Sequence, residues 1–225
     1  TLFINGEFWG LYSINEKFDE NYISSHYLID KNDCTFYEIW NTVRGSENIF
    51  NDYNEFFEWA KTADMTKDEN YQKVCSVLDI QCMADYIAFQ TYICNNDWMS
   101  DGNGNISNNW AMWRSNSVSD SIPYGDGKWR FMVYDTERAA SLFNMENTRF
   151  DFDLLGNMDR TGLYLNISNV FYNLMNNDGF RLFFYDNYVD MMDSVFAPER
   201  VEGIITEMSE LTRNAAEKTN LCFSN

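Results

Sequence analysis

The stretch ICNNDWMSDGNGNISNNWAMWR (residues 93–114) holds the transition on which the predicted fold depends. An apolar run with helical spacing stops at its start, and Asp97 then appears between two Asn residues and a Trp. A Gly/Asn-rich loop leads into an aromatic strand at Trp110, and in WRFMVYDTERA (129–139) a second apolar strand ends on Asp135. One carboxylate therefore follows a helix, an amide precedes a strand, and a second carboxylate ends the next strand.

The residues before this stretch predict a hairpin followed by helices. In residues 2–16, apolar alternation surrounds Asn5-Gly6, a dipeptide typical of tight hairpin turns, and we expect the second strand to end at Glu16-Lys17. Apolar residues recurring every three or four positions predict helices further along the chain. The expected elements are a short helix with a loop over 17–30, helices over 50–62 and 68–95, the latter split near Asp79, and a strand over 34–40.

The residues after this stretch predict a short hairpin and a helical tail. Strands are expected over 108–114 and 128–135, joined by a polar turn, and residues 136–165 look irregular. From residue 166 onward the helical spacing returns, with a break at 177–179 and a final helix that has Pro198 in its first turn. This order of elements predicts an α+β fold, and we expect residues 1–225 to form a single domain.

Composition limits the classes of protein that this sequence can encode. The 225 residues are 45% hydrophobic and 17% aromatic, enough for one well-packed domain or at most two small ones. No window of 18 apolar residues occurs, so no membrane span is expected. A formal charge of −19 argues against nucleic acid as a partner, because such a surface repels phosphate backbones, and it suits sites that recruit cations.

The cysteines do not form a zinc motif. The chain has five Cys and one His, with no C-x-x-C pair, so a structural zinc site is not expected. Cys75 and Cys82 stand two helical turns apart, about 10 Å, which is too far for a disulfide. We expect mostly buried free thiols, with one long-range disulfide left open.

The two acids and the amide have the chemistry of a hard-cation site. Mg²⁺ prefers oxygen ligands and is usually held by one or two carboxylates together with substrate phosphates. In protein kinases a catalytic Asp orients the acceptor hydroxyl, an Asn follows it, and a second Asp after the next hairpin binds metal. Asp97, Asn109 and Asp135 occur in that order. The plainer interpretations are a residue that ends a helix for Asp97 and a strand-end turn for Asp135.

Three stretches resemble the spore coat protein H (CotH) kinase-like family of atypical secreted protein kinases. FINGEFWGLYSINEKFD (3–19) is similar to the family's N-G-x-x-x-G-x-Y-x-x-x-E signature. NNDWMSDGNGNISNNWAMWR (95–114) resembles its D-W…N-N…W-R loop, and GKWRFMVYDTERA (127–139) its G-K-W-R…D-x-D segment. The tail over 169–201 is also family-like. The resemblance implies an atypical protein-kinase-like fold with short β-hairpins and a mostly helical C-terminal part.

The resemblance implies roles for individual residues. Asp97 would be the catalytic acid, and Asp135 and Asn109 would bind Mg²⁺ or Mn²⁺. Glu16 falls on the family's signature Glu and would help to position nucleotide or metal. ATP would be the phosphoryl donor, and Ser or Thr of a secreted or surface protein the acceptor. The implied location is secreted, at the cell surface or in the spore coat.

The sequence departs from the family pattern at three points. The loop before Asn109 is longer than a kinase catalytic loop, so Asn108 competes with Asn109 for the ligand role. Glu137 stands where the family usually has Asp. The family's phosphate-contacting Lys has no counterpart here, so we expect it upstream of residue 1, in an N-terminal lobe of which this chain lacks the first strands.

Two other functions stay open, one because of these departures and one because of the acids and aromatic residues. The first is a catalytically weak or inactive kinase-like surface or coat module that binds protein partners. The second, weaker alternative is a glycosidase with a carboxylate pair, although nothing in the sequence singles out an acid and a base on opposite sides of a sugar.

Overall fold

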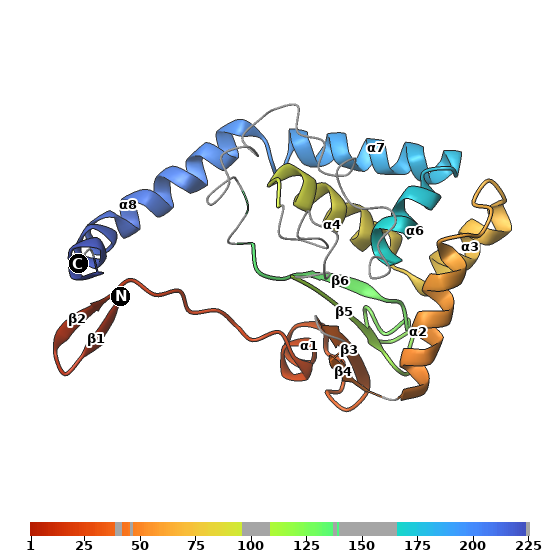
Figure 1. Ribbon diagram of the computed structural model, residues 1–225, viewed down its shortest axis with the longest axis horizontal. Coiled ribbons are helices and arrows are strands. Elements are labelled where there is room, and N and C mark those ends of the chain that lie inside the picture. The colour runs from red at the N-terminus through yellow and green to blue at the C-terminus, as the bar shows by residue number, and fades with distance from the viewer. Residues whose placement is uncertain (39–41, 46, 96–108, 137–138, 140–165, 224–225) are drawn as a thin grey trace. The chain divides into compact units, whose positions relative to one another are not determined.

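A computed structural model describes residues 1–38, 42–45, 47–95, 109–136, 139 and 166–223 (Figure 1). The strands are β1 (Leu2–Ile4), β2 (Glu7–Gly10), β3 (Cys34–Glu38), β4 (Thr42–Arg44), β5 (Trp110–Ser115) and β6 (Arg130–Val133). The helices are α1 (Glu20–Tyr27), α2 (Glu47–Ala60), α3 (Asp68–Val77), α4 (Ile80–Tyr92), α6 (Asn166–Leu174), α7 (Asp178–Asp193) and α8 (Pro198–Phe223). Helices together with small antiparallel sheets agree with the predicted α+β class.

The chain divides into two compact units. Phe18–Tyr188 form the central unit, and Thr1–Lys17 together with Val189–Asn225 form the terminal unit. The expectation of one kinase-like domain over residues 1–225 stays a prediction. No helix in the described ranges is long and apolar enough to cross a membrane.

The central unit is built on an antiparallel sheet in the order β4-β3-β5-β6. Alternate side chains of β5 enter two different cores, as the two-residue period of a strand requires. Trp110 and Met112 belong to the larger core, whereas Ala111 and Trp113 belong to the smaller one. Because both faces of the sheet are covered, β5 is apolar along most of its length instead of alternating with polar residues.

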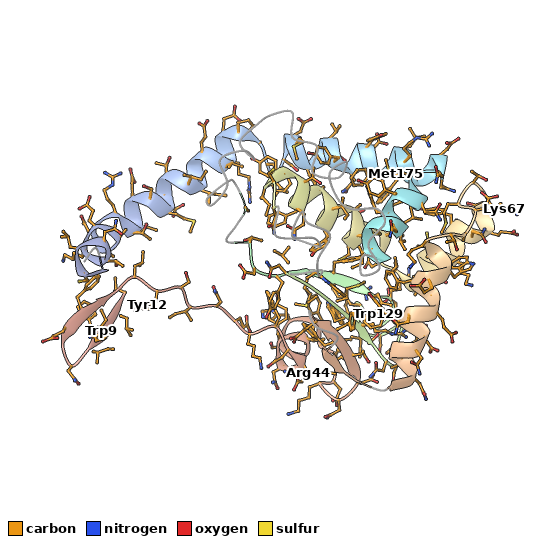
Figure 2. The ribbon with its side chains drawn as sticks, in the orientation of Figure 1. Trp9, Tyr12, Arg44, Lys67, Trp129 and Met175 are labelled. Carbon is orange, nitrogen blue, oxygen red and sulfur yellow. The ribbon has the colours of Figure 1, made fainter. Side chains whose placement is uncertain are left out.

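Five helices supply the larger core. Side chains of α2, α3, α4, α6 and α7 pack there with one face of the sheet, while α1 contributes Ile23 to the smaller core on the other face. Trp129, labelled in Figure 2, is 2% exposed, and its ring lies 5.1 Å from that of Tyr53 in α2. The break predicted at 177–179 is confirmed, because the Asn177 side chain accepts a hydrogen bond from the Phe180 N–H at 2.9 Å and starts α7.

The predicted split near Asp79 is also confirmed, and it has a tertiary cause. The Asp79 carboxylate caps α4 by accepting a hydrogen bond from the Cys82 N–H at 3.0 Å. The backbone beside it extends the sheet, since the Asp79 N–H donates to the Trp129 carbonyl at 3.0 Å and the Trp129 N–H donates to the Val77 carbonyl at 2.8 Å. The chain therefore leaves the helical conformation between α3 and α4 in order to pair with the start of β6.

The terminal unit holds the predicted hairpin, but its second strand is shorter than predicted. Asn5 (φ 52°) and Gly6 (φ 85°) form the tight turn. β2 ends at Gly10 instead of reaching Glu16, because β1 provides backbone partners only as far as Leu2, which pairs with Gly10. The next amide, that of Leu11, donates to the Thr219 hydroxyl of α8 at 2.8 Å instead of to a strand.

Strand β4 was not predicted from the sequence. It is three residues long and pairs with β3 through Arg44 opposite Phe36. Gly45 follows it at φ 140°, and an added Cβ would lie 2.3 Å from the Thr35 hydroxyl, so only glycine fits at this position. The Arg44 side chain, labelled in Figure 2, pairs with Glu20 of α1 at 2.7 Å and ties the edge strand to the helix.

The five cysteines are free, so the long-range disulfide that the sequence left open does not form. Burial raises the pKa of the Cys34 thiol to about 11 and that of the Cys82 thiol to about 12. Both thiols are therefore protonated near neutral pH and behave as small apolar side chains.

Candidate functional site

Asn109 and Asp135 leave the β5–β6 pair at the same end. The last residue pair of this ladder is Trp110 with Val133. Asn109 directly precedes Trp110, and Asp135 follows Val133 by two residues. The antiparallel register therefore brings an amide and a carboxylate that are well separated in sequence to the same end of the β5–β6 pair.

The backbone is left-handed at both residues. Asn109 has φ 56° and Asp135 has φ 37°. Among non-glycine residues, Asn and Asp adopt this conformation most readily. Such positions cluster at functional sites, where the surrounding structure holds them in place. Asn109 is 5% exposed, whereas Asp135 is exposed, so the carboxylate lies in solvent just beyond a buried amide.

Helix α4 runs beside β6 in the same direction and ends toward this edge (Figure 1). A third left-handed residue, Cys94 at φ 49°, stops the helix. Asn95 then folds back onto Gln90, donating from its backbone N–H to the Gln90 carbonyl at 3.1 Å and from its side chain to the Gln90 side-chain oxygen at 3.0 Å. Both amide side chains are fully buried, so the direction in which the chain leaves α4 is fixed.

The predicted site residues divide into three groups. Asn109 and Asp135 are brought together at one end of the β5–β6 pair. Asp97, Asn108 and Glu137 lie outside the described residues. Glu16 belongs to the terminal unit, where it is exposed in the segment after β2.

A carboxylate and an amide suit a hard cation, since Mg²⁺ and Mn²⁺ prefer oxygen ligands. Within the described ranges no three His, Cys, Asp or Glu side chains converge as a metal-binding group. Asp135 and Asn109 carry oxygen atoms of the kind that such an ion prefers.

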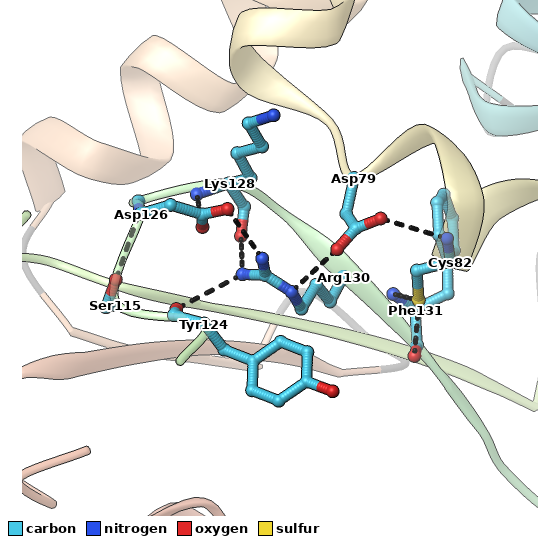
Figure 3. A network of polar contacts seen from close by, with 9 residues as sticks. Asp79, Cys82, Ser115, Tyr124, Asp126, Lys128, Arg130 and Phe131 are labelled. Carbon is cyan, nitrogen blue, oxygen red and sulfur yellow. Dashed lines mark hydrogen bonds and ion pairs between the residues drawn. The ribbon is translucent and has the colours of Figure 1, made fainter. Parts of the chain in front are cut away.

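An ionic cluster around the buried Arg130 occupies the opposite end of the same strand pair (Figure 3). Arg130, 5% exposed, lies between two carboxylates, with its Nε 2.9 Å from Asp79 and an Nη 2.7 Å from Asp126. The contact with Asp79 is an ion pair without a hydrogen bond, because the Nε–H is not aligned with the oxygen. The other Nη donates to the carbonyls of Tyr124 and Lys128 at 3.3 and 3.2 Å.

The charges of this cluster stabilise one another. Burial alone would lower the pKa of the Arg130 guanidinium, but the hydrogen bond and charge of Asp126 and the charge of Asp79 raise it above its usual value. Burial would likewise raise the pKa of the Asp126 carboxyl, and the hydrogen bonds from Arg130 and from the Lys128 N–H lower it overall. Both groups therefore stay ionised across the neutral range.

The cluster gives the G-K-W-R stretch a structural role that the sequence interpretation missed. Gly127 adopts φ 72°, and a Cβ there would lie 3.1 Å from an Arg114 guanidinium nitrogen. Its N–H donates to the buried Ser115 hydroxyl at 3.0 Å. The signal in the sequence is Arg130 itself, an arginine in an apolar strand that needs a buried counter-charge.

One further concavity lies at the β4 edge of the sheet. It is an open cleft of about 590 Å³, lined by residues that include Lys31, Cys34 and Arg44. The charge of Arg44 is satisfied by Glu20, and the Cys34 thiol is not nucleophilic near neutral pH because of its raised pKa. The cleft is therefore a weaker candidate for a reactive site than the end of the β5–β6 pair with Asn109 and Asp135.

The fold is that of an α+β protein in which one end of a strand pair brings an amide and a carboxylate together beside a helix end. The profile of the family described as CotH kinase protein matches residues 1–224. The chain therefore belongs to the CotH kinase family. No curated protein and no solved structure matches it.

Proposed function

We propose that this chain carries the catalytic part of a metal-dependent protein kinase that transfers the γ-phosphoryl group of ATP to Ser or Thr of a secreted, cell-surface or spore-coat protein. The observation that supports it best is the exit of Asn109 and Asp135 from one end of the β5–β6 pair, beside the end of α4. In protein kinases the metal-binding Asn and Asp likewise flank a strand pair that follows the catalytic Asp.

The proposed roles follow from the chemistry of each group. Asp135, exposed and left-handed, would bind Mg²⁺ or Mn²⁺, which supplies charge neutralisation for the phosphates. Asn109 or its neighbour Asn108 would provide the amide ligand, and Glu137 would assist. Asp97, two residues beyond the buried Asn95, would orient the acceptor hydroxyl.

The role of Glu16 is proposed separately, because it rests on the signature N-G-x-x-x-G-x-Y-x-x-x-E alone. In that pattern the Glu would help to position nucleotide or metal. Glu16 is the last residue of the signature and lies after the hairpin that contains the signature residues Asn5, Gly6 and Gly10.

The burial of Asn109 favours a second candidate function. At 5% exposure, this amide contributes little surface to a ligand. A kinase-shaped module that binds protein partners and transfers no phosphoryl group would tolerate such a residue. Metal-dependent nucleotide binding without turnover would identify that module.

Calorimetry and phosphoryl transfer on the full-length protein distinguish the two functions. We expect ATP to bind only with Mg²⁺ or Mn²⁺ present, and labelled γ-phosphate to appear on a protein acceptor. Asp97→Asn should keep binding and reduce transfer by about 10³-fold or more, the size of effect expected for a residue that orients the nucleophile and moves its proton. Binding without transfer in the wild type would support the non-catalytic module, and no metal-dependent binding would contradict both functions.

A further inference from the structure

The cluster around Arg130 joins the two elements that lead to the proposed site. Asp79 uses both of its carboxylate oxygens: one accepts from the Cys82 N–H at 3.0 Å to start α4, and the other lies 2.9 Å from the Arg130 Nε at the start of β6. Asp79 therefore contacts the first turn of the helix and the first residue of the strand at once (Figure 3).

Cys82 makes a second connection between the same elements. The Phe131 N–H donates to the Cys82 sulfur at 3.3 Å, and the thiol donates to the Phe131 carbonyl at 3.5 Å. The Tyr86 ring, one turn further along α4, stacks on Phe131 with ring centroids 5.1 Å apart. These contacts fix the helix to the strand at their common start.

From this start α4 and β6 run side by side toward the proposed site. α4 has 13 residues, which corresponds to about 20 Å. A tilt of about 5° at its start would move its far end by about 2 Å over that length. Catalytic and metal-binding groups lose on the order of 10²-fold in rate when they are misplaced by about 1 Å.

We propose that Asp79 and Arg130 are positioning residues for the metal and acceptor site. Their ion pair contributes to the angle between α4 and β6, and hence to the separation between Asn95 at the end of α4 and Asp135 beyond the end of β6. This inference rests on the proposed kinase function. It assigns to the Arg of G-K-W-R a role in alignment at a distance from the phosphates.

Asp79→Asn separates this role from simple stabilisation. Asn is as good a helix cap as Asp, so the hydrogen bond from the Cys82 N–H is retained. Arg130 keeps Asp126 as its counter-charge, so no buried charge is left alone. The variant is therefore expected to fold. It loses the ion pair between α4 and β6, while the contacts of Cys82 and Tyr86 with Phe131 remain.

The test measures metal affinity, steady-state kinetics and thermal unfolding on the full-length protein. We expect Asp79→Asn to weaken Mg²⁺-dependent ATP binding and to lower kcat, each by about tenfold or more, with little change in KM for the protein acceptor. Hydrogen exchange at the end of α4, around Asn95, should accelerate. Glu58→Gln is the matched control, because it neutralises the partner of Lys61 in an ion pair on α2 away from the site.

The outcomes distinguish this inference from the proposed function. A wild type without metal-dependent ATP binding overturns both. The positioning role alone is overturned if the wild type binds ATP and transfers phosphate, and the metal affinity and kcat of Asp79→Asn stay within twofold of the wild-type values. A lowered Tm with unchanged metal affinity and kcat would show that the ion pair only stabilises the fold.

Discussion

The two ends of the β5–β6 pair differ in the exposure of their charged side chains. At the Arg130 end the guanidinium is nearly inaccessible and lies between two carboxylates and two carbonyls. At the other end the backbone is left-handed at Asn109 and Asp135, and the carboxylate of Asp135 faces solvent. Left-handed residues at one end therefore face a tightly held ion cluster at the other, and the surrounding structure is what keeps such conformations in place.

The largest expected effect comes from removing the charge at the exposed end. Asp135→Asn keeps the shape of the side chain and a residue type that tolerates φ 37°, so the fold should be unchanged. We expect metal-dependent ATP binding to weaken by about 100-fold, measured by calorimetry. Asp120→Asn, an exposed acid in the turn before β6, is the control and should bind like the wild type. Equal affinity in both variants would remove Asp135 from the site.

Removing the charge at the fixed end should instead damage stability. Arg130→Met leaves the partly exposed Asp79 and Asp126 without their common partner and is expected to lower the free energy of unfolding by about 2–3 kcal/mol, measured by urea denaturation. Arg181→Met in α7 is the control. Its ion pair with Asp178 is largely exposed, so a loss of about 0–1 kcal/mol is expected. A similar loss in both variants would mean that the Arg130 cluster contributes no more than a surface pair.

A smaller effect is expected from the turn that carries Asp126. Gly127→Ala places a Cβ on a residue at φ 72°, 3.1 Å from an Arg114 nitrogen. The left-handed conformation alone costs about 1–2 kcal/mol for a residue with a Cβ. Urea denaturation should show a loss of this size with unchanged metal affinity. Wild-type stability would show that the turn relaxes without disturbing the cluster.

The smallest expected effect is a dependence on pH. The pKa of Asp126 is lowered in the folded protein, so its contribution to stability is present above its unfolded pKa of about 3.9 and is lost as the pH falls below that value. Between pH 6 and pH 3, the Tm of the wild type should therefore fall more steeply than the Tm of Asp126→Asn. Parallel curves would show that Arg130 is neutralised mainly by Asp79.

Local chemistry accounts for what could be predicted from the sequence. The turn at Asn5-Gly6 and the start of α7 at Asn177 depend on residues that act on their own stretch of backbone. At Asp79 the local cap on α4 could be predicted, whereas the backbone pairing with Trp129 that also splits the helix could not. That Asn109 and Asp135 lie at the same end of the strand pair follows from the hairpin alone. Two consecutive antiparallel strands bring their outer flanking residues together.

Partners distant in sequence account for what could not be predicted. The end of β2 at Gly10 depends on how far β1 extends, and β4 exists because β3 has a free edge. The role of Arg130 depends on Asp79, which lies beyond a long loop and β5. An interpretation based on local pattern treats Asp79 as a helix cap and Arg130 as part of a signature, and it does not show that they touch.

The left-handed backbone at Asn109 and Asp135 also restricts how these positions can change in evolution. Gly, Asn and Asp are the residues that such a bend admits at low cost, and two of these three carry oxygen ligands. In a saturation library, variants selected only for folding would retain these residue types at both positions. Neutral drift would therefore keep these two positions within one substitution of an oxygen-bearing side chain, whatever function the protein serves.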